Sequence, residues 1–223
     1  MHNDCKGQIK SKIGIMNGLI FIPDISGFTK FVSNIDIELG MSVTRDLLNN
    51  IIENNSLGMD LSEIEGDAIL FYKLGKPIPL KYVLRSFKNM YEAFDASYRR
   101  WKIQYNIEAD LSLKLIVHYG NILVYDIKGF KKLYGETVIE SHNLLKNGNN
   151  EKNYILITED YLNALHQHAP VIKTFNPTYV SFKSQLTTDA KRISYYFFSG
   201  NKMTSAASTR MLSRVHSLPA IGI

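Results

Sequence analysis

Apolar and polar positions follow two different periods along the chain, which predicts a mixture of strands and helices. Runs of β-branched and aromatic residues bounded by Gly, Pro or Asn predict strands, and apolar residues spaced three and four apart predict amphipathic helices. Strands are expected at 18–24, 59–64, 68–73, 111–117, 121–127, 153–157, near 179–184 and near 191–198, and helices from Phe28, at 37–55, about 79–104, 136–147 and 159–167. Two hairpins are expected, with turns at Glu65-Gly66-Asp67 and His118-Tyr119-Gly120.

The resulting order, β-α-α-β-β-α-β-β-α-β-α-β-β, predicts an α+β fold of the ferredoxin-like sandwich kind. Helices interrupt pairs of strands, so the sheet is expected to be mainly antiparallel and covered by helices. The 223 residues suffice for one domain with a proper core, and residues 18–199 are expected to form it. The polar segment 1–17 is expected to be partly disordered, and the Ser-, Ala- and Gly-rich segment 200–223 to be a flexible tail.

The amino-acid composition indicates the cellular compartment and the classes of partner to expect. Hydrophobic residues make up 45% and charged residues 21%, as in ordinary soluble proteins. The single cysteine, Cys5, fits a reducing cytoplasm, and the apolar run before Pro23 is too short for a signal or membrane segment. A net charge of +5 suits a polyphosphate ligand and equally suits a Lys-rich surface. The sequence contains no dense basic stripe of the kind that would indicate a nucleic-acid partner.

Two segments carry carboxylates where a metal-bound phosphate would need them. Asp24 ends an apolar strand, and the Gly-containing turn and helix after it can direct backbone N–H groups at an anion. The alternative for Asp24 is an ordinary N-cap. Glu63, Glu65 and Asp67 lie within five residues on one hairpin. Their repulsion favours a bound cation, and an exposed acidic turn is the alternative.

Together the two segments resemble the class III adenylyl and guanylyl cyclase catalytic domain. Asp24-Ile25-Ser26-Gly27-Phe28-Thr29 is similar to the first metal motif of that family, and Gly66-Asp67-Ala68 to the second. The strand end at 115–120 and the turn at 133–138 resemble two further motifs, and all four follow the order of the family. After residue 150 only the strand–helix–strand pattern is similar. The resemblance indicates a divergent bacterial, Bacteroidetes-like, branch of cyclase-like proteins.

The resemblance implies a metal-dependent nucleotidyl cyclase that converts a nucleoside triphosphate to a 3′,5′-cyclic nucleotide and pyrophosphate. Asp24 and Asp67 would be the catalytic pair that binds two Mg²⁺ or Mn²⁺ ions, with the Ile25 carbonyl as a further ligand. In this family the active sites lie between the two chains of a head-to-tail dimer, so a homodimer is also implied. Phosphate oxygens would be bound by the backbone N–H groups of Ser26, Gly27, Phe28 and Thr29.

Glu63 and Lys132 fall at the two positions where the family reads the nucleobase. Adenylyl cyclases have Lys and guanylyl cyclases Glu at the first position, and a carboxylate can accept hydrogen bonds from guanine N1–H and N2–H. Lys132 stands where adenylyl cyclases have Asp, and it could donate to guanine O6 or uracil O4. The resemblance therefore implies a preference for GTP, with a pyrimidine triphosphate or ATP as alternatives.

Two positions depart from the family at the transition-state residues. The family Asn falls at Ile139, which cannot orient a ribose, and the family Arg at Asn143, which cannot neutralise charge on the α-phosphate. Loss of one such contact typically lowers the rate by about 10²–10³. His142, Lys146 or Lys131 could substitute, or could be surface residues. The alternative function is therefore a catalytically degenerate cyclase-like domain that binds nucleotide and metal, or a protein partner.

Overall fold

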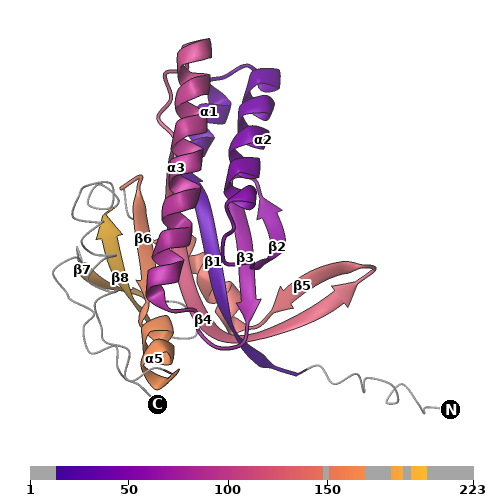
Figure 1. Ribbon diagram of the computed structural model, residues 1–223, viewed down its shortest axis with the longest axis vertical. Helices are drawn as coiled ribbons and strands as arrows, with labels where there is room; N and C mark the ends of the chain where they lie inside the picture. Colours follow the sequence, from indigo (N-terminus) through magenta and orange to yellow (C-terminus); the bar gives the residue numbers. More distant parts are fainter. Residues whose placement is uncertain (1–13, 148–150, 169–181, 188–191, 200–223) are drawn as a thin grey trace, which may run out of the picture.

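The structure is a computed structural model that describes residues 14–147, 151–168, 182–187 and 192–199, and its elements follow the predicted order (Figure 1). The expected N-terminal and C-terminal tails lie largely or wholly outside the described residues, although the first strand starts at Met16 instead of at 18. The elements are β1 (Met16–Ser26), α1 (Phe28–Ser33), α2 (Ile37–Glu53), β2 (Asp60–Glu65), β3 (Ala68–Leu74), α3 (Leu80–Tyr105), β4 (Ser112–Ile127), β5 (Phe130–Tyr134), α4 (Glu136–Leu145), β6 (Tyr154–Thr158), α5 (Glu159–His168), β7 (Phe182–Thr187) and β8 (Arg192–Ser199).

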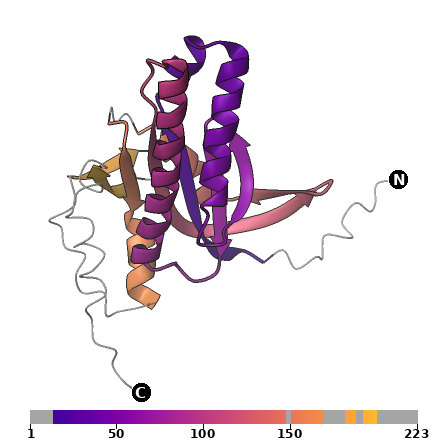
Figure 2. The same cartoon turned by 45° about the horizontal axis from the view of Figure 1, so that its top comes forward.

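One sheet organises the molecule. Its strand order is β2-β3-β1-β4-β6-β8-β7, and β5 pairs with β4 beside that path. All pairs are antiparallel except β4 with β6. Helices α2 and α3 lie side by side over one face (Figures 1 and 2), whereas Leu144 of α4 packs in the core cluster of the other face. The predicted α+β class with a mainly antiparallel, helix-covered sheet is confirmed.

Strand β1 is buried on both faces because it lies in the middle of the sheet. Leu19, Phe21 and Ile25 pack in the cluster under α2 and α3, and the alternating residues Ile20 and Ile22 pack in the cluster on the α4 face. A central strand of this kind reads as a continuous apolar run instead of an alternation. Since side chains alternate along a strand, Asp24 lies on the same face as Ile20 and Ile22.

The long helix α3 buries one stripe against the sheet. Val83, Phe87, Met90, Phe94 and Tyr98 recur at helical spacing and are at most 4% exposed. The helix ends at Tyr105, and the following cap residue, Asn106, adopts a left-handed conformation with φ 50°. Neither this helix nor any other in the described part of the chain combines the length and apolarity needed to cross a membrane.

The expected hairpin turn at His118-Tyr119-Gly120 is wrong. Strand β4 is continuous and pairs with β1 without interruption from Ile122 to Ser112. The chain reverses instead at Lys128 and Gly129, whose φ values are 52° and 87°. Gly120 serves a close approach: a Cβ there would lie 2.5 Å from the Oγ1 atom of Thr137 in α4. A glycine that admits a neighbour into a strand has the same sequence signature as a turn glycine, which is why the pattern misleads here.

Candidate functional site

Strands β1 and β4 and the β2–β3 turn bring together Asp24, Asp67 and a third residue, Lys114. Asp24 is paired across the sheet with Ala68 on one side and Lys114 on the other. Its Oδ2 atom lies 2.8 Å from the Lys114 Nζ atom, and the Asp24 side chain is only 11% exposed. Asp67 precedes Ala68 in the turn, and its carbonyl oxygen accepts a hydrogen bond of 3.2 Å from the N–H of Ile25. The two aspartates predicted to bind metal are therefore neighbours.

The electrostatics of this group show how costly it is to hold two carboxylates together. Burial, the negative charge of Asp24 and a hydrogen bond between the two side chains raise the pKa of Asp67 to about 7. Burial lowers the pKa of Lys114, but the charge of Asp24 and the hydrogen bond to it raise that pKa by more, so the net pKa lies above its ordinary value. A proton on one carboxyl and a lysine on the other thus compensate charge that a divalent cation could compensate instead.

Lys114 is the part of this group that sequence reasoning missed. The signal available was a single lysine between Leu113 and Leu115 in an apolar strand. A charged side chain at such a position needs a buried partner. The identity of that partner depends on the β1–β4 register, which no local pattern contains.

The turn after Asp24 leads directly into the short helix α1. Gly27 begins it with φ 88°, and a Cβ at this position would lie 2.6 Å from the carbonyl oxygen of Asp110, so two constraints require glycine there. Ile25 is buried, whereas Gly27 and Thr29 are exposed and Ser26 and Phe28 are half-buried. The segment predicted to bind phosphate therefore lies at the surface next to Asp24, and its role stays a prediction.

The two predicted base-reading residues form an ion pair with each other. The Lys132 Nζ atom of β5 lies 2.6 Å from the Glu63 Oε2 atom of β2. The hydrogen bond with Glu63 and its charge raise the pKa of Lys132. His142 of α4 joins this group: its Nε2 atom is 3.5 Å from Glu63 Oε1 and its Nδ1 atom is 3.9 Å from Glu65 Oε2. This group adjoins the Asp67 turn, because Glu65 is the last residue of β2.

The two positions that depart from the family lie on the outer side of α4. Ile139 is 64% exposed, and Asn143, one turn later, is half-buried. Of the substitutes considered, His142 lies beside Glu63, whereas Lys131 and Lys146 have exposed side chains. This side of α4 therefore presents an apolar residue, an amide and a nearby imidazole.

Of the comparisons with known proteins, those with solved structures show the architecture. A sequence profile described as "Protein of unknown function (DUF2652)" matches residues 44–154, and no curated protein sequence matches the chain significantly. The adenylyl cyclase CyaB from P. aeruginosa is similar in structure, with a TM-score of 0.66 and 15% identity over 83% of this chain and 94% of that chain. The guanylyl cyclase Cya2 gives 0.60 and 14% over 83% and 92%. The guanylate cyclase domain of RhGC from Catenaria anguillulae, solved in complex with GTP, gives 0.54 and 15% over 82% and 96%.

Proposed function

Because the chain has the fold of class III adenylyl and guanylyl cyclase catalytic domains, we propose that it is a metal-dependent nucleotidyl cyclase. It converts a nucleoside triphosphate, with GTP favoured, to a 3′,5′-cyclic nucleotide and pyrophosphate. The observation that supports this most is the contact between the side chains of Asp24 and Asp67, where burial together with the charge of Asp24 and the hydrogen bond to it raises the pKa of Asp67 to about 7. Two carboxylates in such proximity are unfavourable without a cation and are the oxygen ligands that Mg²⁺ and Mn²⁺ prefer.

In the proposed reaction the ribose 3′-oxygen forms a bond to the α-phosphorus while its hydroxyl proton passes to solvent water. The bond from that phosphorus to the oxygen that bridges it to the β-phosphorus breaks, and pyrophosphate leaves. Two divalent ions bound by Asp24, Asp67 and the Ile25 carbonyl would favour loss of the hydroxyl proton and neutralise the leaving group. Asp67 loses its own proton when it becomes a ligand. Lys114 keeps a positive charge beside Asp24, next to the place of the phosphates, and the N–H groups of residues 26–29 orient the phosphate oxygens.

The Glu63–Lys132 pair supports the choice of GTP. It presents a hydrogen-bond acceptor and a donor side by side, with 2.6 Å between Lys132 Nζ and Glu63 Oε2. Guanine presents the complementary pattern, because its N1–H and N2–H groups donate and its O6 atom accepts. Adenine lacks an acceptor at the O6 position, so ATP is the weaker candidate, with a pyrimidine triphosphate between them.

A head-to-tail homodimer is part of the proposal. The β4–β5 hairpin extends away from the rest of the sheet (Figure 1). It carries apolar side chains that are largely exposed in the single chain: Ile127 is 52% exposed, Phe130 72% and Tyr134 70%. Exposed apolar groups of this size on a projecting element favour contact with another protein surface.

A second candidate function is a degenerate cyclase-like domain that binds nucleotide and metal without turnover. The specific observation that favours it is the outer side of α4, where Ile139 and Asn143 supply no positive charge. Each missing transition-state contact typically lowers the rate by about 10²–10³. The enzyme is placed first because a pure scaffold has no need for the Asp24–Asp67 pair.

One experiment separates the two. The full chain is incubated with each of the four triphosphates and Mn²⁺, and cyclic product is measured by mass spectrometry. Turnover that is lost in Asp24→Ala and Asp67→Ala, but kept in the matched control Asp60→Ala on exposed β2, supports the cyclase. Absence of product from every triphosphate, under conditions where a known cyclase turns over, contradicts it. A rise in melting temperature with Mn²⁺ and nucleotide but without product supports the second candidate.

A further inference from the structure

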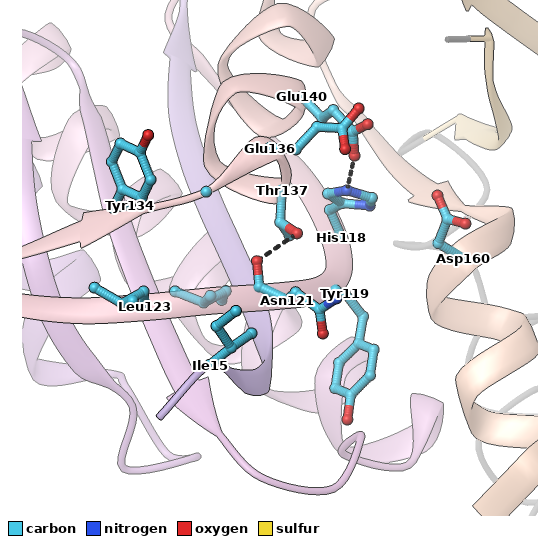
Figure 3. Close-up of a pocket in the computed structure, with 13 residues that line it drawn as sticks. Ile15, His118, Tyr119, Asn121, Leu123, Tyr134, Glu136, Thr137, Glu140 and Asp160 are labelled. Atoms are coloured by element: carbon cyan, nitrogen blue, oxygen red, sulfur yellow. Dashed lines mark hydrogen bonds and ion pairs between the residues drawn. The ribbon is translucent and has the colours of Figure 1, made fainter. Parts of the chain in front are cut away.

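A second group of side chains, of the types that can bind metals, lies further along β4. His118 of β4, Glu140 of α4 and Asp160 of α5 each offer one ligand atom, and these atoms all lie within 4.8 Å of one another. Figure 3 shows Glu140 and Asp160 on two different sides of the His118 ring. His118 is four residues from Lys114, or about 13 Å along the strand at 3.3 Å per residue. The group is therefore separate from the Asp24–Asp67 site.

Two of the three side chains are deeply buried. His118 is 1% exposed and Glu140 is 3% exposed. The Nε2 atom of His118 lies 2.8 Å from Glu140 Oε2, and its Nδ1 atom lies 2.9 Å from the Oγ1 atom of Thr158. Thr158 thus holds one ring nitrogen and leaves the other directed at the carboxylate. This is the arrangement that orients histidines bound to metals, where the second ring nitrogen is held by an outer hydrogen bond.

The group forms part of the wall of a cavity of about 320 Å³ (Figure 3). Glu136 lines the same cavity as His118, Glu140 and Asp160, whereas none of the described residues that line it is Lys or Arg. The wall therefore carries three carboxylates and one imidazole. Carboxylate oxygens and imidazole nitrogens are ligand types that divalent transition metals take.

The start of α4 is clamped onto β4, which fixes Glu140 over His118. The Oγ1 atom of Thr137 donates a 2.9 Å hydrogen bond to the carbonyl of Asn121. Gly120 admits Thr137, since a Cβ at 120 would lie 2.5 Å from its Oγ1 atom. Glu140 follows Thr137 by three residues on the same face of the helix. Ligands whose backbones are locked in this way are preorganised for binding.

We propose that His118, Glu140 and Asp160 bind one divalent transition-metal ion of the Zn²⁺ kind. An imidazole nitrogen with two carboxylate oxygens suits these ions better than Mg²⁺ or Ca²⁺, which take oxygen ligands. Bonds of about 2.0–2.2 Å place ligand atoms at most about 4.4 Å apart. The observed limit of 4.8 Å exceeds that spacing by only about 0.4 Å. Three protein ligands leave a coordination position open toward the cavity.

The test uses the full chain with Asp24→Asn and Asp67→Asn, which removes the other candidate metal site. Co²⁺ alone is the probe, because its visible absorption reports nitrogen ligation. We expect one Co²⁺ per chain in this background. Adding Asp160→Asn should weaken Co²⁺ binding by at least about tenfold, since even outer-shell partners of metal ligands are worth 10- to 100-fold. The matched control Glu159→Gln, on the preceding residue of α5, should keep the affinity.

Two binding results would overturn the proposal, and an NMR result is a third. The binding results are no Co²⁺ bound in the Asp24→Asn, Asp67→Asn background, or equal affinities in the Asp160→Asn and Glu159→Gln chains when both show cooperative melting. Because replacing the buried His118 could unfold the protein, this histidine is left in place and its coordination is tested by NMR. The Co²⁺-loaded protein should show one strongly shifted, exchangeable imidazole N–H signal, from the Nδ1 atom held by Thr158, and its absence also contradicts the site. These outcomes leave the cyclase proposal untouched, because the Asp24–Asp67 pair is already removed.

Discussion

Two regions of strand β4 place different partners beside buried carboxylates. At one end of β4, the Lys114 Nζ atom lies 2.8 Å from the Asp24 Oδ2 atom, and the pKa of the neighbouring Asp67 is raised to about 7. Further along, His118 meets Glu140 in a cavity whose described lining contains no Lys or Arg. In the first region, a lysine and a retained proton compensate the two carboxylates within the chain. In the second region the carboxylate of Glu140 contacts an imidazole nitrogen of His118 at 2.8 Å, in place of a lysine.

The largest effect is expected on turnover. Asp24→Ala or Asp67→Ala should lower cyclic nucleotide formation by at least about 10³-fold, because the loss of a metal ligand removes the main source of transition-state charge stabilisation. Product formation by mass spectrometry with Mn²⁺ and GTP measures it. Asp60→Ala, which removes an exposed carboxylate from β2, should retain full turnover, and an equal loss there would show that the effect is not specific to the pair.

The next effect concerns the internal lysine. Lys114→Met should lower the free energy of unfolding by about 2 kcal/mol, because removing one partner of a buried pair leaves the other charge uncompensated. The effect is below that of a fully buried pair because the Lys114 side chain is 18% exposed. Denaturant unfolding at neutral pH measures it.

Mn²⁺ should restore much of the stability lost in Lys114→Met, since a bound cation replaces the missing charge. Lys132→Met breaks the pair between Lys132 and Glu63, whose side chains are 41% and 21% exposed, and should have a smaller effect on unfolding. Equal effects of the two lysine substitutions would contradict the view that Lys114 compensates a buried carboxylate.

Gly120 provides a test of the second region, where α4 packs against β4. Gly120→Ala should lower the free energy of unfolding by about 1–3 kcal/mol, the usual cost of forcing an extra methyl group into a packed site. The Cβ would lie 2.5 Å from Thr137 Oγ1. The double variant Gly120→Ala, Thr137→Ala should lose less free energy of unfolding than the sum of the two single losses, because Thr137→Ala removes the clash. Gly14→Ala, which meets nothing within 4 Å, should be neutral. Additive effects would refute the clamp between β4 and α4.

The smallest effect is a pH dependence of stability. The pKa of Asp67 is about 7 in the folded protein, above the ordinary value of 3.8. The stability associated with its protonated form is therefore full below pH 3.8 and is lost as pH rises to about 7. Asp67→Asn should melt a few degrees higher than the natural chain at pH 8, and the difference should vanish on acidification.

The same titration governs metal binding. Because Asp67 binds metal only when ionised, Mn²⁺ affinity should rise with pH until about pH 7 and then level off. A melting temperature that responds equally to Mn²⁺ at pH 5 and pH 8 would argue against a metal site at this pair.

Much of the fold could be predicted from local patterns. The helical spacing of Phe87, Met90 and Phe94 and the continuous apolar run of β1 follow from burial of one helix stripe and of both strand faces. The prediction failed at Gly120, because a glycine required by a neighbour from α4 is indistinguishable in sequence from a glycine required by a turn. The true reversal at Lys128 and Gly129 depends on a register that extends β4 past that position.

For the candidate site, the sequence alone identified two carboxylates, Asp24 at the end of a predicted strand and Asp67 in a predicted turn. It also placed Glu63 and Lys132 at positions that resemble base-reading ones. Only the tertiary structure decided that Asp24 has Lys114 as its partner and that Glu63 and Lys132 bind each other. It also decided that His118, Glu140 and Asp160 converge from three elements. The physical reason is the range of the interactions. Periodicity and turn chemistry act between near neighbours in sequence, whereas strand register and helix placement bring together charges that are far apart along the chain.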